Sequence, residues 1–141
     1  MELMIVIAII SFLSVLSIPH LMKVLAKAKR AEAYLYLRSI AAAERIYFAE
    51  HGTYTLTLYG KEGIDWKPEG QHSYTYGFPG TQEGVGHFVG TLGASSNDLA
   101  RGSVTNVGFT AVAAAKIYGD KVDVLTINEK GVIKLVSDGL S

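Results

Sequence analysis

The sequence predicts an α+β fold in which one long N-terminal α-helix packs on a C-terminal antiparallel β-sheet. Three observations predict it: a charge-free apolar run at the start, a stretch of helix formers directly after it, and alternating apolar segments between glycine-rich turns in the second half. We divide the chain into a hydrophobic helix, residues 1–22, its amphipathic continuation, residues 23–51, and a head, residues 52–141. A chain of 141 residues has room for one such head.

The apolar run predicts a retained transmembrane helix. Residues 3–22 contain no Asp, Glu, Lys or Arg, and only Ser11, Ser14, Ser17, Pro19 and His20 interrupt the apolar side chains. As a helix the run is about 30 Å long, which matches the hydrocarbon core of a bilayer. A buried core helix is usually shorter, and a cleaved signal peptide needs a basic start, where this chain has an acidic one.

Two kinds of polar residue in this segment need an explanation. Glu2 fits the positive end of the helix dipole, or it pairs with a cation from another chain. Pro19 removes an amide from the helix, so we expect a kink or a broken turn there. The neighbouring serines can bond the freed carbonyls or nearby backbone; they are Ser11, Ser14 and Ser17.

The helix is predicted to continue beyond the membrane. Residues 23–51 lack Pro and Gly and are rich in helix formers, and Gly52 suits a left-handed C-cap. One helix of about fifty residues, roughly 75 Å long, follows. The head cannot cover that length, so the first half must project.

The second half of the helix carries two apolar stripes at helical spacing. One contains Leu21, Leu25, Ala28, Leu35, Ala42, Ile46 and Ala49, and the other Leu37, Ile40, Tyr47 and Phe48. One face against the head and another against a neighbouring chain would explain two stripes; deep burial in the head explains them almost as well. The cations face solvent or acids of neighbours; they are Lys23, Lys27, Lys29 and Arg30.

The head is predicted to be an antiparallel meander. Strand patterns cover 72–78, 86–92, 109–117, 121–127 and 132–136. In the first, Tyr74, Tyr76 and Phe78 share one face; the alanines of the third also fit a short helix. Gly119-Asp120 predicts a two-residue hairpin. Residues 53–70 and 94–106 are predicted as loops.

Composition and motifs argue against an enzyme. There is no cysteine, and positive and negative charges balance at 13 each, so nucleic acid is an unlikely main partner. The four histidines have no metal-ligand spacing, and we predict no cofactor and no metal. A calcium site near the last hairpins is the less favoured alternative to solvated hairpin ends; its oxygen ligands would be Asp120, Asp123, Asn128 and Glu129.

The segment from Glu2 to Ile10, with Pro19 nine residues further on, resembles the N-terminal helix of type IV pilins and pseudopilins. The likeness continues to residues 50–54 and, more weakly, to residues 123–129. It implies a single-pass inner-membrane precursor that a prepilin peptidase cleaves and N-methylates. The pilus assembly machinery then polymerises it into an extracellular filament, a helical homopolymer, on the bacterial surface.

The resemblance also assigns roles to residues. Subunits would pack through Glu2, Leu3, Ile5, Val6, Ile9, Ile10, Phe12, Leu13, Leu16 and Pro19, with Glu2 pairing with a neighbour's amino terminus. The segment that would lose helical regularity in the filament contains Ser11, Ser14, Ser17 and Pro19. Filaments of this kind serve adhesion, twitching motility or DNA uptake.

The sequence departs from the family at several points. It begins at Met1 directly before Glu2, so we expect an upstream basic leader followed by Gly-Phe-Thr-Leu. Ser11 replaces a common glycine, and the cysteine pair that often closes the C-terminal loop is missing. Two alternatives remain: a pseudopilin of a type II secretion system, and a single-span anchored binding module that never polymerises.

Overall fold

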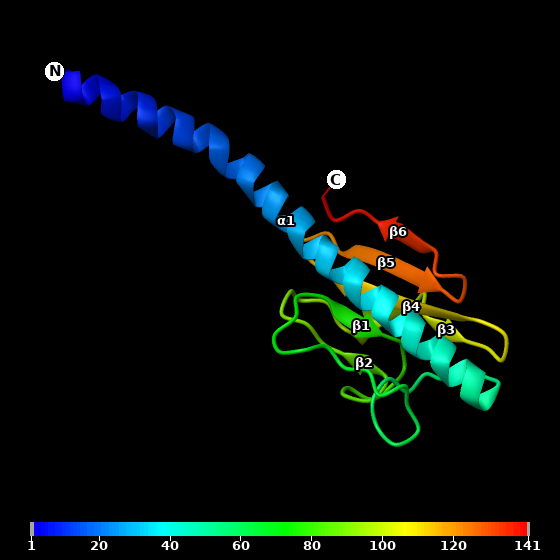
Figure 1. The fold of residues 1–141 in the computed structure, drawn as a ribbon. Coiled ribbons are helices and arrows are strands. Elements are labelled where there is room, and N and C mark those ends of the chain that lie inside the picture. Colours follow the sequence, from blue (N-terminus) through cyan, green and yellow to red (C-terminus); the bar gives the residue numbers. More distant parts are fainter. Residues whose placement is uncertain (1, 141) are drawn as a thin grey trace.

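The structure, a computed structural model, describes residues 2–140, and one helix dominates it. Helix α1 spans Glu2–His51, 50 residues without interruption, which confirms the predicted single helix. Figure 1 shows its first half projecting away from the rest of the chain and its second half lying across the sheet. The head, residues 52–140 of the described chain, therefore covers only the second half of α1.

The helix continues through Pro19, so the broken turn expected there does not occur. Figure 1 shows a gradual curve along the projecting half instead. Ser14 Oγ donates to the Ile10 carbonyl at 2.7 Å, and Ser17 Oγ donates to the Leu13 carbonyl at 2.8 Å. Both serines bond carbonyls four residues back, and neither takes the carbonyl that Pro19 leaves without its amide.

The C-terminal end of α1 is where the sequence predicts it. Gly52 has φ +75°, and its N–H donates to the Phe48 carbonyl at 2.7 Å. This left-handed residue satisfies one of the last helical carbonyls and turns the chain back towards the sheet. Glycine adopts that conformation without the steric cost that a Cβ imposes.

Replacing Gly52 with alanine should therefore lower the free energy of unfolding by about 1 kcal/mol. A Cβ at this position would meet nothing within 4 Å, so the cost is one of backbone conformation alone. Gly52→Asn should cost less, because asparagine tolerates the left-handed region. Thermal unfolding of the full chain in detergent measures both, and equal losses for Ala and Asn would contradict the explanation.

The head contains a six-stranded antiparallel sheet and one short 3-10 helix. Its strands lie in the order β2-β1-β4-β5-β6, with β3 also paired to β4. The elements are β1 Thr75–Gly77, β2 His87–Phe88, η1 Ser96–Leu99, β3 Ser103–Val104, β4 Phe109–Ala115, β5 Asp123–Asn128 and β6 Ile133–Ser137. This architecture confirms the predicted pilin-like α+β fold. Strands β3, β4, β5 and β6 pair in chain order as a meander, whereas β1 pairs with β4 across a longer connection.

The predicted strands are confirmed with altered lengths. The aromatic face of β1 is fully buried, and residues 109–115 form a strand, not a helix. The pattern at 86–92 yields only the two residues of β2. The expected loop 94–106 contains η1 and β3. A capping box at Ser95 and Asp98 stabilises η1, and this spacing was a readable signal in the sequence.

The predicted two-residue hairpin at Gly119-Asp120 is wrong. Ala115 pairs with Asp123, so residues 116–122 all belong to the connection. The strand ends early because the Lys116 N–H donates to the Leu92 carbonyl at 3.0 Å instead of pairing with β5. Ile117 is buried in the core, which holds the chain away from a tight turn.

Small side chains let α1 lie close to the sheet. The helix packs on β4 and β5, and β4 presents Ala111, Ala113 and Ala115 to the core. The buried face of the helix consists of Ala26, Ala33, Leu37, Ile40, Ala41 and Glu44. Trp66, from the expected 53–70 loop, completes this core with edge-to-face contacts to Tyr36 and Tyr76.

One of the two predicted stripes faces outward along its whole length. We call it the exposed stripe, and it consists of Leu21, Leu25, Ala28, Leu35, Ala42, Ile46 and Ala49. In the other stripe Leu37 and Ile40 are buried, whereas Tyr47 is half-buried and Phe48 is exposed. Deep burial in the chain's own head is therefore wrong as an explanation of the first stripe.

Candidate functional site

The projecting half of α1 presents an extended apolar surface. Every residue from 2 to 25 is exposed, and by length and composition this helix can cross a membrane. The apolar residues assigned to subunit packing are 52–77% exposed; they are Leu3, Ile5, Val6, Ile9, Ile10, Phe12, Leu13 and Leu16. Such a surface is unstable in water, so it needs lipid or another protein around it.

The polar residues of the assigned site lie on the same projecting half. Glu2 occupies the first turn of α1, where the helix dipole favours a carboxylate. Ser11 and Pro19 are exposed, as are the two serines that bond backbone carbonyls. The structure thus places all the residues predicted to pack between subunits on the projecting half of α1, where they are exposed and do not contact the head.

The exposed stripe extends this surface beyond the projecting half. It runs from Leu21 to Ala49, past the point where the head begins to cover the opposite side of the helix. Leu35 and Ile46 are 72% and 62% exposed. Together the two regions make one outward-facing apolar surface along the whole helix.

A charged network anchors α1 to the head where the projecting half ends. Arg30 pairs with Asp123 of β5 and with Asp138 near the C-terminus, at 2.7 Å in the second case. Asp123 also accepts hydrogen bonds from Tyr74 Oη at 2.6 Å and from the Gly139 N–H at 2.9 Å. Asp123 is completely buried, so it is not the solvated hairpin end that the sequence predicts.

The environment of this network shifts several pKa values. Hydrogen bonding to Asp123 raises the pKa of Arg30 above its ordinary value. Burial, followed by the contact with Asp123, raises the pKa of Tyr74. The Leu140 N–H, followed by Arg30, lowers the pKa of Asp138. Arg30, Tyr74 and Asp138 therefore keep their usual charges at neutral pH, which suits a structural anchor better than proton transfer.

Glu32 makes a second connection between α1 and the sheet. Its carboxylate accepts hydrogen bonds from the N–H groups of Ser73 and Tyr74 and from Tyr76 Oη at 2.9 Å. Burial, with Glu32 as the next cause, raises the pKa of Tyr76. This carboxylate satisfies backbone groups just before β1, and the sequence pattern did not single it out.

The described residues contain no group of three or more side chains arranged to hold a metal ion. Of the histidines, His87 is buried in β2, where its Nδ1 lies 3.0 Å from Thr81 Oγ1. The arrangement offers a charged anchor between α1 and the head and an exposed apolar surface on the projecting half.

Comparison with known proteins shows a partial similarity to a pilin. No family model matches the sequence. The type IV major pilin protein PilA of Myxococcus xanthus (strain DK1622) is 36% identical to the chain over 75 residues. The match covers 53% of this chain and 33% of the relative, so it spans about a third of the relative's length. It supports a place in the pilin family.

Proposed function

We propose that this chain is a structural subunit of an extracellular type IV pilus, without enzymatic activity. The observation that carries the proposal is the exposure of the whole projecting half of α1, in a helix apolar enough to cross a membrane. The likeness to a pilin over about half of the chain supports it. Before assembly the subunit would be a single-pass protein of the inner membrane, and after assembly part of a filament outside the cell.

The physical basis is a change of surroundings for the apolar helix. Burying on the order of 1,000 Å² of apolar surface among other copies would stabilise the subunit by about 25 kcal/mol relative to water. Relative to lipid the gain is far smaller, because lipid tails are as apolar as the helix. The pilus assembly machinery must therefore extract the subunit, while the finished filament persists in water.

Each part of the chain then has its own task. Residues 1–22 would form the filament core, residues 23–51 would carry the exposed stripe against neighbours, and the head would face outward. Glu2 would pair with the amino terminus of an adjacent copy after the prepilin peptidase has acted. The segment from Ser11 to Pro19 would lose helical regularity on assembly. Adhesion, twitching motility or DNA uptake would be the filament's task.

Substitution of Leu13 by aspartate tests the proposal. A carboxylate at this exposed apolar position costs about 2.5–3.5 kcal/mol in an apolar environment, so filaments should fall at least tenfold. Filaments sheared from producing cells are counted by negative-stain electron microscopy and compared with total subunit. The matched control is Asn106→Asp, which adds the same charge to an exposed residue of the head.

The wild-type images decide between the candidates. Micrometre-long fibres at the cell surface support the pilus. Short periplasmic stubs would instead indicate a pseudopilus of a secretion system, and monodisperse protein in detergent with no filament in cells would indicate an anchored binding module. Leu13→Asp filaments at wild-type abundance would contradict the assembly role of the projecting half.

A further inference from the structure

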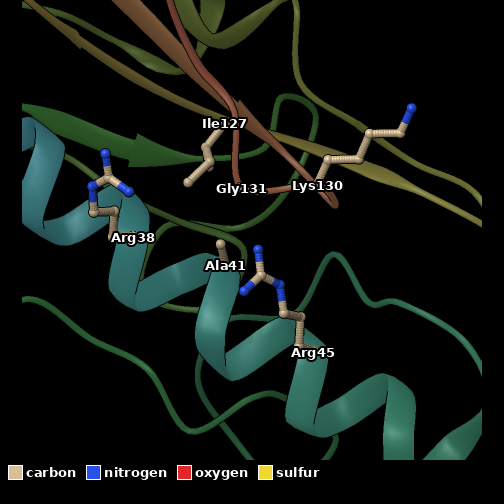
Figure 2. Close-up of a pocket in the computed structure, with 6 residues that line it drawn as sticks. All are labelled: Arg38, Ala41, Arg45, Ile127, Lys130 and Gly131. Atoms are coloured by element: carbon tan, nitrogen blue, oxygen red, sulfur yellow. The ribbon is translucent and has the colours of Figure 1, made fainter.

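A basic cleft lies between α1 and the turn that joins β5 to β6. Its volume is about 280 Å³, and we call it the arginine cleft; its lining is Arg38, Ala41, Arg45, Ile127, Lys130 and Gly131. Figure 2 shows the Arg45 guanidinium group reaching from the helix towards Gly131, the Arg38 guanidinium group rising from the same helix on the other side of Ile127, and the Lys130 side chain extending away from both. Gly131 leaves room for them: a Cβ there would lie 2.5 Å from Arg45 Nη2.

These three cations have no acidic partner within residues 2–140. The helix supplies none, because the positions three and four residues from Arg38 and Arg45 are all apolar or tyrosine. The turn supplies none either, since the carboxylate of Glu129 lies against Gly108. Glu44, next to Arg45 in sequence, is buried and bonds Thr55.

The chemistry of the arginine cleft selects a carboxylate. Guanidinium groups present several N–H donors in a planar fork that matches the two oxygens of a carboxylate. The two guanidinium charges beside one small cleft also repel each other, so an arriving anion relieves that repulsion. Ala41 and Ile127 give the cleft an apolar floor beside the guanidinium groups, suited to the stem of an acidic side chain.

An acidic counterpart lies on the other side of the same helix. A cleft of about 170 Å³, the acidic cleft, includes Ile46, Glu50 and His51 of α1 together with Ile64 and Asp65. Figure 1 shows the two sides: β5 and β6 on one side of α1, and the segment after residue 52 with β1 and β2 on the other. Glu50 and Asp65 are exposed and have no ion-pair partner among residues 2–140.

Asp65 is held rigidly. Its φ is +55°, the only positive φ outside glycine in the described chain. The residues on both sides fix it, because the Ile64 N–H donates to the Thr57 carbonyl and the Trp66 N–H to the Leu58 carbonyl at 2.8 Å. A carboxylate on a fixed backbone loses less entropy when it binds than one on a mobile loop.

We infer that the acidic cleft of one copy docks on the arginine cleft of the next copy, with Glu50 and Asp65 facing Arg38, Arg45 and Lys130. This inference rests on the proposed function and specifies how neighbouring heads meet within the filament. Because the two clefts lie on opposite sides of α1, the contact is heterologous, and repetition of such a contact builds an open helical array instead of a closed dimer. The exposed Ile46, which lines the acidic cleft, would be covered with it.

A charge-exchange experiment in the full chain tests the contact. Arg38→Glu with Arg45→Glu, and separately Glu50→Arg with Asp65→Arg, should each reduce sheared filaments at least about tenfold, because like charges would then face each other. Combining all four substitutions should restore the filaments. Lys134→Glu, an exposed change on β6 outside both clefts, is the control and should leave filament yield unchanged.

Crosslinking gives a second measurement that does not depend on yield. The chain has no cysteine, so Lys130→Cys with Asp65→Cys introduces one defined pair. Oxidation of filaments should give a ladder of covalent multimers, whereas either single-cysteine chain should give at most dimers.

The outcomes of the two experiments separate the contact from the proposed function. If the wild type forms filaments, the double-cysteine filaments give no ladder and the charge-reversed variants are unaffected, the contact alone is overturned. The contact would also be overturned if both reversed variants lost filaments and the fourfold variant did not restore them. The arginine cleft would then bind an anion other than the acidic cleft of the next copy. Absence of wild-type filaments would instead overturn the proposed function.

Discussion

Replacing Asp123 with alanine should lower the free energy of unfolding by about 3–5 kcal/mol, because the change leaves a charge and a hydroxyl without their partner. Asp123 is fully buried and bonds Arg30, Tyr74 Oη and the Gly139 N–H at once. These contacts fix α1, β1 and the C-terminal segment to β5. Chemical denaturation of the full chain in detergent, followed by circular dichroism, measures the loss.

The matched control is Asp120→Ala, the same substitution at an exposed position three residues earlier. Asp120→Ala should leave stability within 0.5 kcal/mol of the wild type, as is usual for surface changes. Tyr74→Phe keeps the buried ring and removes one hydrogen bond to Asp123, so it should cost about 1–2 kcal/mol. If Asp123→Ala were no more harmful than Asp120→Ala, Asp123 would not be the anchor described here.

The second large effect concerns the pH dependence of stability. Glu44 is fully buried on α1; one of its oxygens accepts the Thr55 N–H at 3.1 Å, and Oε1 has no hydrogen-bond partner. Burial raises the pKa of Glu44 from 4.5 to about 7. Since the folded state holds this proton more tightly than the unfolded state, the stability from Glu44 is complete below pH 4.5 and is lost as the pH rises through 7. The free energy of unfolding should fall by about 2–3 kcal/mol across that interval.

Glu44→Gln should remove this dependence. Glutamine keeps an acceptor for the Thr55 N–H and cannot ionise, so the variant should match the wild type near pH 4.5 and exceed its stability by about 2–3 kcal/mol at pH 8. Unfolding curves of both chains at several pH values give the difference directly, because their other titrating groups are shared. Glu50→Gln, an exposed position on the same helix, is the control. Parallel curves for wild type and Glu44→Gln would show that Glu44 stays ionised in the folded protein.

The elements with strong local signals were predictable. An uninterrupted run of helix formers up to Gly52 marks α1 at both ends, and alternating aromatics mark β1. The exposed stripe was visible as a second apolar face, although only the fold shows that it points outward. The apolar character of the projecting half was also predictable, because a potential membrane span is recognised by composition over about 20 residues; its role in subunit packing stays a prediction.

The remaining features depend on contacts between distant positions. Arg30 and Asp123 are 93 residues apart, and nothing local in either segment indicates the pair. Glu44 was indistinguishable from a surface glutamate, because helical position alone does not say which face the sheet covers. The connection at 116–122 was missed because Lys116 bonds to Leu92 of a different part of the head. The two oppositely charged clefts could likewise not be predicted, because each combines side chains of α1 with residues from a distant part of the head.

The continuity of α1 has a mechanical consequence for a filament of such subunits. Tension along the fibre would be carried from rod to rod through the projecting halves, and the helix passes under the sheet without a break. Each head would then be attached to the helical core that bears the load, without bearing the load itself. Local unfolding of a single head would leave the packed helices intact, so the tensile strength of the filament would not be limited by the stability of its heads.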